Sequence, residues 1–172
     1  MNYIIEELSL ENVEDYARVN AQAWKESYVG IIKDDFLSLI NTEEEIQKLI
    51  EKLKSNLSNK LERSFILKVD GKAVGIVRVG KSRVDDYPDY GELYAIYLLD
   101  VAKKKGYGRV LFEKAKEELK KMGYTKMFNG CIEGNTANDF YQHIGGKFIW
   151  QKKLSIPNGQ IVNENIYNYE EI

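Results

Sequence analysis

The chain has 172 residues, 44% of them hydrophobic and 12% aromatic, which is enough apolar material for one packed domain over residues 1–172. Its formal net charge of −2 gives no general attraction to nucleic acid or anionic membranes, and the lack of a long apolar run or a secretory leader predicts a soluble, cytoplasmic protein. Cys131 and His143 are the single residues of their types, which excludes an internal disulfide and argues against a metal site.

The N-terminal third of the chain is predicted to be mainly helical. Ser9 is expected to cap the first helix, in which apolar residues recur at helical spacing. Thr42 and Glu45 form a capping box at the start of the third helix. The predicted elements are a short strand at 3–6 and helices at 11–28, at 33–40 and from 42 to about 57.

Strand patterns begin at residue 65. The dipeptide Asp70-Gly71 between two apolar runs predicts a β-hairpin, because this pair suits a primed two-residue turn. Residues 92–99 form a nearly unbroken apolar run with one charge, as expected of a central strand that is covered on both faces.

The C-terminal half alternates helices and strands. The predicted elements are a helix at 109–122 that stops at Gly123, a strand at 126–132, a helix at 136–144, and a final hairpin of residues 147–154 and 160–169. This order favours an α/β fold, a mixed sheet with helices on both faces.

A loop that could bind phosphate precedes the helix at 109–122. Gly106 and Gly108 would let the backbone approach an anion, and unpaired amides at the start of the helix would point toward it. Four cations stand in the same seven residues, Lys103, Lys104, Lys105 and Arg109. The pattern is neither a P-loop nor a dinucleotide-binding fingerprint, and the alternative is a solvated turn.

With this loop in place, the sequence resembles the GNAT superfamily of N-acetyltransferases. The family's acetyl-CoA signature has a Gln or Arg, then Gly-x-Gly or Gly-x-Ala, and Lys103-x-x-Gly106-x-Gly108 matches its glycines with a Lys in the first place. A second motif runs from Asn135 through Phe140-Tyr141 to Gly145 and Phe148. The resemblance implies a mostly antiparallel sheet of about six or seven strands, with two parallel strands splayed apart by a bulge.

The resemblance also implies the chemistry: direct transfer of the acetyl group of acetyl-CoA to a primary amine of a small molecule or peptide in a ternary complex. Tyr141 matches the family's proton donor to the departing thiolate. The cofactor-binding residues implied by the family or expected from the loop are Ile96, Tyr97, Leu98, Lys103, Lys104, Lys105, Gly106, Tyr107, Gly108, Arg109, Asn135, Asn138 and Tyr141. The alternatives for Tyr141 and Asn135 are an ordinary buried aromatic and a helix cap.

The general base is less defined. Glu92 is the charged residue in an apolar strand, so burial would favour its use as a base, either directly or through a water. The alternatives are a solvent-facing carboxylate at Glu92 and a base role for Tyr94. Cys131 as an acylated nucleophile and His143 as a triad base are disfavoured, because the chain has no partner motif for either.

For the acceptor, we expect a cationic amine. Four carboxylates stand within eight residues at Asp85, Asp86, Asp89 and Glu92, and Trp24 and Tyr28 lie one helical turn apart with aromatic faces for a cation. A second function class stays open, a non-catalytic acyl-CoA-binding sensor or scaffold of the same fold. Homodimer formation, the acceptor's identity and a preference for another acyl group also stay open.

Overall fold

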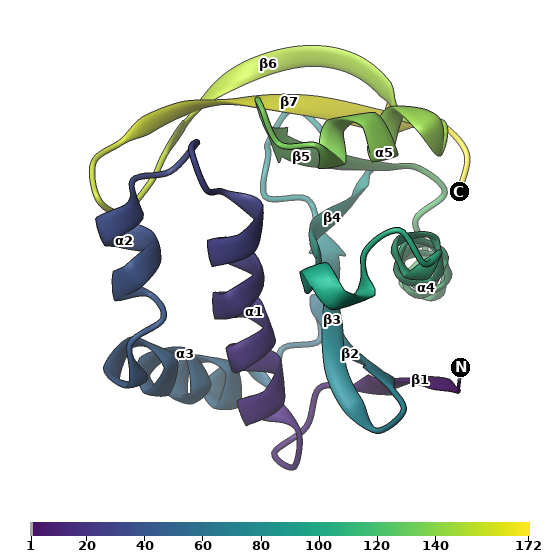
Figure 1. Cartoon of the computed structure of the whole chain (residues 1–172). Coiled ribbons are helices and arrows are strands. Elements are labelled where there is room, and N and C mark those ends of the chain that lie inside the picture. Colours follow the sequence, from purple (N-terminus) through teal and green to yellow (C-terminus); the bar gives the residue numbers. More distant parts are fainter. Residues whose placement is uncertain (1) are drawn as a thin grey trace.

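The computed structural model describes residues 2–172, which form one twisted sheet with helices on both faces (Figure 1). The strands of the described residues are β1 Tyr3–Glu7, β2 Glu62–Val69, β3 Lys72–Lys81, β4 Gly91–Leu98, β5 Met127–Ile132, β6 Lys147–Ser155 and β7 Ile161–Tyr169. The helices are α1 Val13–Ser27, α2 Asp34–Leu39, α3 Glu43–Asn56, α4 Tyr107–Lys121 and α5 Ala137–His143, with a 3₁₀ turn, η1, at Asp100–Ala102.

The sheet contains seven strands in the order β1-β2-β3-β4-β5-β7-β6. Neighbouring strands are antiparallel except for β4 and β5, which are parallel. This confirms the predicted mixed sheet with one parallel pair.

The parallel pair is joined over a short stretch only. Gly91–Leu93 of β4 pairs with Met127–Asn129 of β5, and beyond these residues the two strands diverge. On the other side of β4, Ala95 pairs with Arg78 and Leu93 pairs with Val79, so Tyr94 is an extra residue in β4. Such a bulge bends its strand and increases the local twist, and it accounts for the divergence of the strands.

Alternation along the strands divides the core into two layers. Phe65 and Leu67 of β2 face α4 and pack with its buried residue Leu111, whereas Ile66 between them faces α1 and α3. A third cluster, around Tyr28 and neighbouring residues, lies between α2 and the C-terminal hairpin. The sheet is therefore covered on both faces at its centre, as the apolar run of β4 predicts.

The start of α1 differs from the prediction. Its N-cap is Asn12, and the helix begins at Val13, so the prediction of a cap at Ser9 is wrong. Asn12 Oδ1 accepts from the Ser9 amide at 2.9 Å, and Asn12 Nδ2 donates to the carbonyl of Glu7 at 3.0 Å. These bonds close a turn between β1 and α1, and the helix starts only after it. At α3 only half of the predicted capping box forms: Thr42 is the N-cap, and the Glu45 amide donates to Thr42 Oγ1 at 3.4 Å, but the Thr42 amide donates to the Leu39 carbonyl and the Glu45 carboxylate pairs with Lys48.

The predicted hairpin turn also forms. Asp70 and Gly71 have φ angles of 49° and 78°, as a primed two-residue turn requires. The next helix start differs: α4 begins at Tyr107 rather than at residue 109, directly after Gly106.

No helix in residues 2–172 has both the length and the apolar character needed to span a membrane.

Candidate functional site

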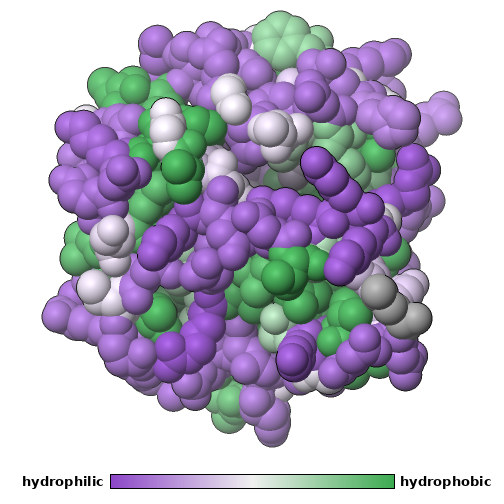
Figure 2. Space-filling model, in the orientation of Figure 1, coloured by the Kyte–Doolittle hydropathy of each residue, from purple (hydrophilic) through white to green (hydrophobic). Residues whose placement is uncertain are grey.

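A cavity of about 860 Å³ opens where β4 and β5 diverge. Residues Tyr94–Leu98 of β4 form one wall, and Gly130–Ile132 of β5 form the other. The end of α1, the loop before α4, helix α5 and the turn between β6 and β7 complete the lining. In Figure 2, apolar atoms are visible in the recess below α5, within a surface that is mostly polar.

The loop before α4 forms the cationic end of this cavity. Gly106 is the residue before the helix and has a φ of 87°, a left-handed conformation that favours glycine. The amides of Gly106 and Gly108 donate no hydrogen bond within residues 2–172. Both glycines line the cavity together with Lys103 and Arg109. Free amides at a helix N-terminus with two nearby cations can bind a phosphate group.

Two further residues of this loop do not line the cavity. Tyr107 is 6% exposed and packs in the core, with its ring centre 5.9 Å from that of Tyr3, and Lys105 is exposed to solvent. Lys104 does line the cavity, and the nearby Lys103 Nζ is 2.7 Å from Asp100 Oδ1. The structure thus brings together most, but not all, of the loop residues expected to bind cofactor.

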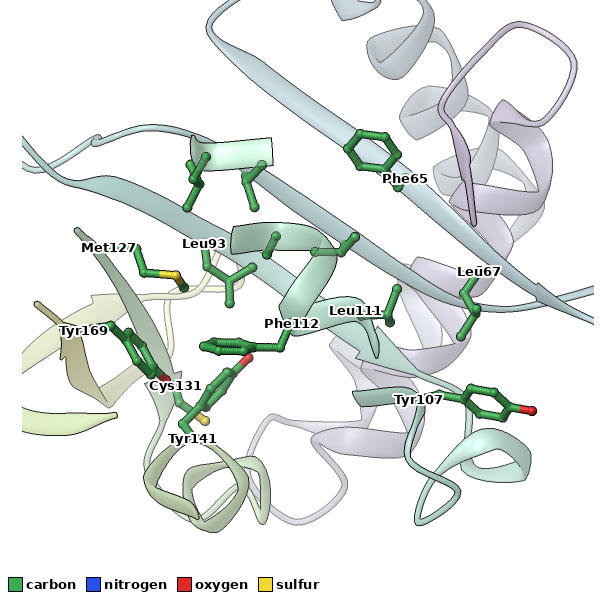
Figure 3. Packing of buried hydrophobic residues seen from close by; sticks show 14 of the residues in the cluster. Phe65, Leu67, Leu93, Tyr107, Leu111, Phe112, Met127, Cys131, Tyr141 and Tyr169 are labelled. Atoms are coloured by element: carbon green, nitrogen blue, oxygen red, sulfur yellow. The ribbon is translucent and has the colours of Figure 1, made fainter. Parts of the chain in front are cut away.

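Tyr141 lies on the opposite part of the cavity wall, in α5. Its ring packs at 6.1 Å from Tyr167 and 5.3 Å from Phe140, and its hydroxyl makes no hydrogen bond within the described residues. Figure 3 shows Tyr141 and Cys131 close to Phe112. Burial, with smaller effects from Cys131 and other nearby groups, raises the pKa of Tyr141 well above its usual range. The phenol therefore stays protonated at neutral pH and keeps a proton to donate.

Cys131 shows what this environment does to a thiol. Burial, and to a lesser degree the charge of Glu164, raises the pKa of Cys131 to about 12. A thiol in this position is protonated and unreactive at neutral pH, in line with the sequence argument against an acylated cysteine.

Asn135 and Asn138 have different surroundings. Asn135 lines the cavity, and its side-chain oxygen accepts from the amide of Ala137 at 2.9 Å, so its position combines helix capping with access to a ligand. Asn138 lies outside the lining. Its side-chain amide donates to the carbonyls of Ile132 and Asn135, and its oxygen accepts from two side chains of β7, with the Tyr167 hydroxyl at 2.8 Å. Asn138 therefore ties the helix of Tyr141 to β5 and β7.

Three aromatic rings cover the other end of the cavity. The Trp24 ring centre lies 4.9 Å from that of Tyr28 and 6.3 Å from that of Tyr97, and the two tyrosine hydroxyls are 3.2 Å apart. Burial raises the pKa of both Tyr28 and Tyr97 above the usual value, so both hydroxyls are neutral hydrogen-bonding groups at pH 7. The structure thus brings Trp24 and Tyr28 to the wall, as expected from the sequence.

Glu92 is buried, as expected, but it lies behind the cavity wall. The Arg83 amide donates to Glu92 Oε2 at 2.8 Å, and the Arg83 guanidinium donates to Oε1 at 2.7 Å. Arg83 itself lines the cavity, and its guanidinium carbon is 4.2 Å from the centre of the Tyr94 ring. A proton path from the cavity to Glu92 would run past Arg83 or through a water.

The acidic loop before β4 stays apart from the cavity. Asp85, Asp86 and Asp89 are exposed and do not line it. The loop is anchored by aromatic packing, with the Tyr87 ring centre 5.3 Å from that of Phe128. Any effect of these carboxylates on an acceptor would act at a distance.

Several lining residues were not identified from the sequence: Arg83, Gly130, Asp139, Glu164 and the hairpin residues Leu154, Ser155, Ile156 and Pro157. The hairpin has no motif that could have placed it at the cavity. Glu164 could have been identified from the sequence, because it lies between the apolar residues Val162 and Ile166 on one face of a strand. A single charge in an apolar strand is the same pattern that identified Glu92.

Comparisons with known proteins agree with this geometry. The family model described as the acetyltransferase (GNAT) family matches residues 22–145. The chain is 34% identical over 139 residues to an uncharacterized N-acetyltransferase, YuaI, from Bacillus subtilis, across 80% of this chain and 76% of that protein.

Solved structures show the same fold. The PaiA N-acetyltransferase of Thermoplasma acidophilum, in complex with coenzyme A, has a TM-score of 0.72 and 22% identity, covering 95% of this chain and 98% of its own. YncA of Salmonella typhimurium, solved with its cofactor acetyl-CoA, has a TM-score of 0.73 and 14% identity. The match covers 98% of this chain and 94% of the YncA chain. Given its family match and its YuaI-like sequence, the chain belongs to the GNAT family of N-acetyltransferases.

Proposed function

We propose that this protein, acting as one domain, transfers the acetyl group of acetyl-CoA directly to a primary amine of a small molecule or peptide. The observation that carries the proposal is the cavity between β4 and β5. The amides of Gly106 and Gly108 at one end of it, and the hydroxyl of Tyr141 on its wall, have no hydrogen-bond partner within residues 2–172. Bound there, acetyl-CoA would supply an acetyl group activated as a thioester.

The residues present fit this donor. Gly106 and Gly108 would bind the pyrophosphate through their amides, with Lys103, Lys104 and Arg109 adding positive charge. Beyond Leu93, the edge of β4 toward β5 pairs with no strand in the described part of the chain, so backbone groups of Ile96–Leu98 face the gap. These groups would bind the pantetheine arm and polarise the thioester carbonyl.

Tyr141 would act as the proton donor. As the bond between the amine nitrogen and the acetyl carbon forms and the carbon–sulfur bond breaks, the Tyr141 hydroxyl gives its proton to the sulfur. A phenol with a raised pKa can do so because the same burial makes a thiolate more basic, as the pKa of about 12 at Cys131 indicates. The amine loses its proton on the opposite side, where Glu92 stays the proposed acceptor through a water beside Arg83.

The acceptor is proposed to be a cationic amine. Trp24, Tyr28 and Tyr97 provide aromatic faces, and Asp85, Asp86 and Asp89 would attract a cation from solution without touching it.

The test is release of free thiol from acetyl-CoA with tyramine, spermidine, glucosamine and an alanyl peptide as acceptors. We expect amine-dependent thiol release and an acetylated product of matching mass with at least one of them. Tight acetyl-CoA binding measured by calorimetry, without thiol release for any acceptor, would contradict the proposal and support a non-catalytic module.

A further inference from the structure

Glu164 places a carboxylate in the cavity on the side away from Tyr141. It lies in β7 opposite Ile132 of β5 and Lys152 of β6. Its side chain is 17% exposed and lines the cavity. Its strand neighbours two residues away, Val162 and Ile166, are apolar, so a charge at this position is not explained by packing.

Gly130 provides the space that this carboxylate occupies. A Cβ atom on Gly130 would lie 2.1 Å from Glu164 Oε1 and 2.4 Å from its Cδ. The carboxylate therefore lies directly on the backbone of β5, at the edge that faces the gap. The next residue, Cys131, faces Tyr141 from the other side of the strand, which brings Glu164 and Tyr141 to opposite sides of one short segment.

The charges around the cavity leave one oxygen of Glu164 available. Arg83, the cation at this end, is already bonded to Glu92. Lys152 Nζ is 3.2 Å from Glu164 Oε2, and within residues 2–172 no side chain or amide forms a hydrogen bond to Oε1. Asp139, the other acidic residue of the lining, is exposed on the first turn of α5.

We propose that Glu164 Oε1 binds the ammonium group of the acceptor and so selects amines that are protonated in solution and carry no carboxylate beside the amine. This inference rests on the proposed acetyl transfer. The apolar body of the acceptor would lie against Trp24, Tyr28 and Ile156, which line the same end. An amino acid would bring its own carboxylate close to Glu164, and the two like charges would repel each other.

The test uses the most active amine of the acceptor panel and compares Glu164→Gln with Glu133→Gln. Glu133 is an exposed glutamate at the end of β5, bonded to Asn163 and outside the cavity. Glu164→Gln is expected to raise the acceptor KM about tenfold or more, while the KM of acetyl-CoA and the Tm stay close to wild type. Glu133→Gln is expected to leave both KM values unchanged.

Two further variants separate acceptor binding from a structural ion pair. Gly130→Ala is expected to displace the Glu164 carboxylate and raise the acceptor KM in the same way, because its Cβ would overlap with Oε1. Lys152→Gln removes the competing cation and is expected to lower the acceptor KM. If Lys152→Gln and Glu164→Gln instead raise KM equally, or if Glu164→Gln has no effect in an active enzyme, the inference is wrong. Absence of activity in the wild type would contradict the proposed function itself.

Discussion

Arg83 binds the buried carboxylate of Glu92 from two directions. Its backbone amide donates to Oε2 at 2.8 Å, and its guanidinium donates to Oε1 at 2.7 and 3.2 Å. The same guanidinium lies on the ring of Tyr94, the bulge residue that separates β4 from β5. The ion pair is therefore part of the structure that opens the cavity, in addition to any role in proton transfer.

The two roles of this pair can be separated by comparing Glu92→Gln with Arg83→Gln. If Glu92 receives the proton of the amine, Glu92→Gln lowers kcat by about 10²-fold with little change in the acceptor KM. Arg83→Gln is expected to lower the Tm, because the buried carboxylate of Glu92 loses its partner. It should reduce kcat much less than Glu92→Gln does, because the carboxylate itself is kept. Steady-state kinetics and thermal unfolding measure both effects. Equal losses of kcat in the two variants would show that the pair only shapes the site.

The glycine loop should anchor acetyl-CoA. Gly106→Val places a β-branched side chain at a φ of 87° beside the proposed pyrophosphate site. We expect the dissociation constant of acetyl-CoA to rise tenfold or more, which corresponds to a loss of about 1.4 kcal/mol of binding free energy. Gly123, at the opposite end of α4, has a φ of 94° and offers the matched control Gly123→Val. Both variants should lose stability, but only Gly106→Val should weaken binding measured by calorimetry. If both variants fold and bind acetyl-CoA with equal affinity, the glycine loop is not part of the acetyl-CoA site.

Tyr141→Phe should keep acetyl-CoA affinity and lower kcat by about 10²-fold or more. The control is Tyr169→Phe, since Tyr169 is also buried in this core, has a hydroxyl without a partner among the described residues and does not line the cavity. Because burial raises the pKa of Tyr141 above 10, the proton donor is lost only as the pH rises through that higher value. The wild-type kcat should therefore show no decline from this residue below pH 10. Near-normal turnover of Tyr141→Phe, with chemistry shown to be rate-limiting, would exclude the acid role.

The sequence predicted the features that depend on local pattern. The hairpin at Asp70-Gly71, the loop at Gly106 and the helix that carries Tyr141 each follow from turn chemistry or from a short motif. The cap at Ser9 was wrong because Asn12, three residues later, bonds back to the Ser9 amide and closes a turn first.

Features that depend on strand pairing were not predictable. Glu164 and Gly130 are 34 positions apart in the chain, and their contact follows from the register of β5 with β7. In the same way, nothing in the local sequence indicates that Arg83 would neutralise Glu92, since this needs the loop before β4 to fold back onto the strand. Long-range register is set by the whole sheet and is absent from local periodicity.

The stability of the protein in acid should depend on Glu62, which is bonded to Arg78, the neighbour of the bulge residue Tyr94. Its carboxylate accepts from Asn59 at 2.8 Å and from Arg78 Nε at 2.7 Å, and Arg78 lies 5.3 Å from the ring of Tyr94. Burial alone would raise the pKa of Glu62, but hydrogen bonds from Asn56, Arg78 and Asn59 outweigh it and hold this pKa below 4.5.

A carboxylate with a lowered pKa in the folded state stabilises the protein above its unfolded pKa, and this contribution disappears as the pH falls through the folded value. Glu62→Gln should therefore lower the free energy of unfolding by about 1–2 kcal/mol at pH 7, and the difference from wild type should shrink as the pH falls through the lowered folded-state pKa. Glu51→Gln, which removes an exposed carboxylate paired with Lys54 on α3, should cost less than about 1 kcal/mol. Urea unfolding of the three proteins between pH 7 and pH 3 measures the effect. A difference between Glu62→Gln and wild type that does not change with pH would show that Glu62 acts through packing alone.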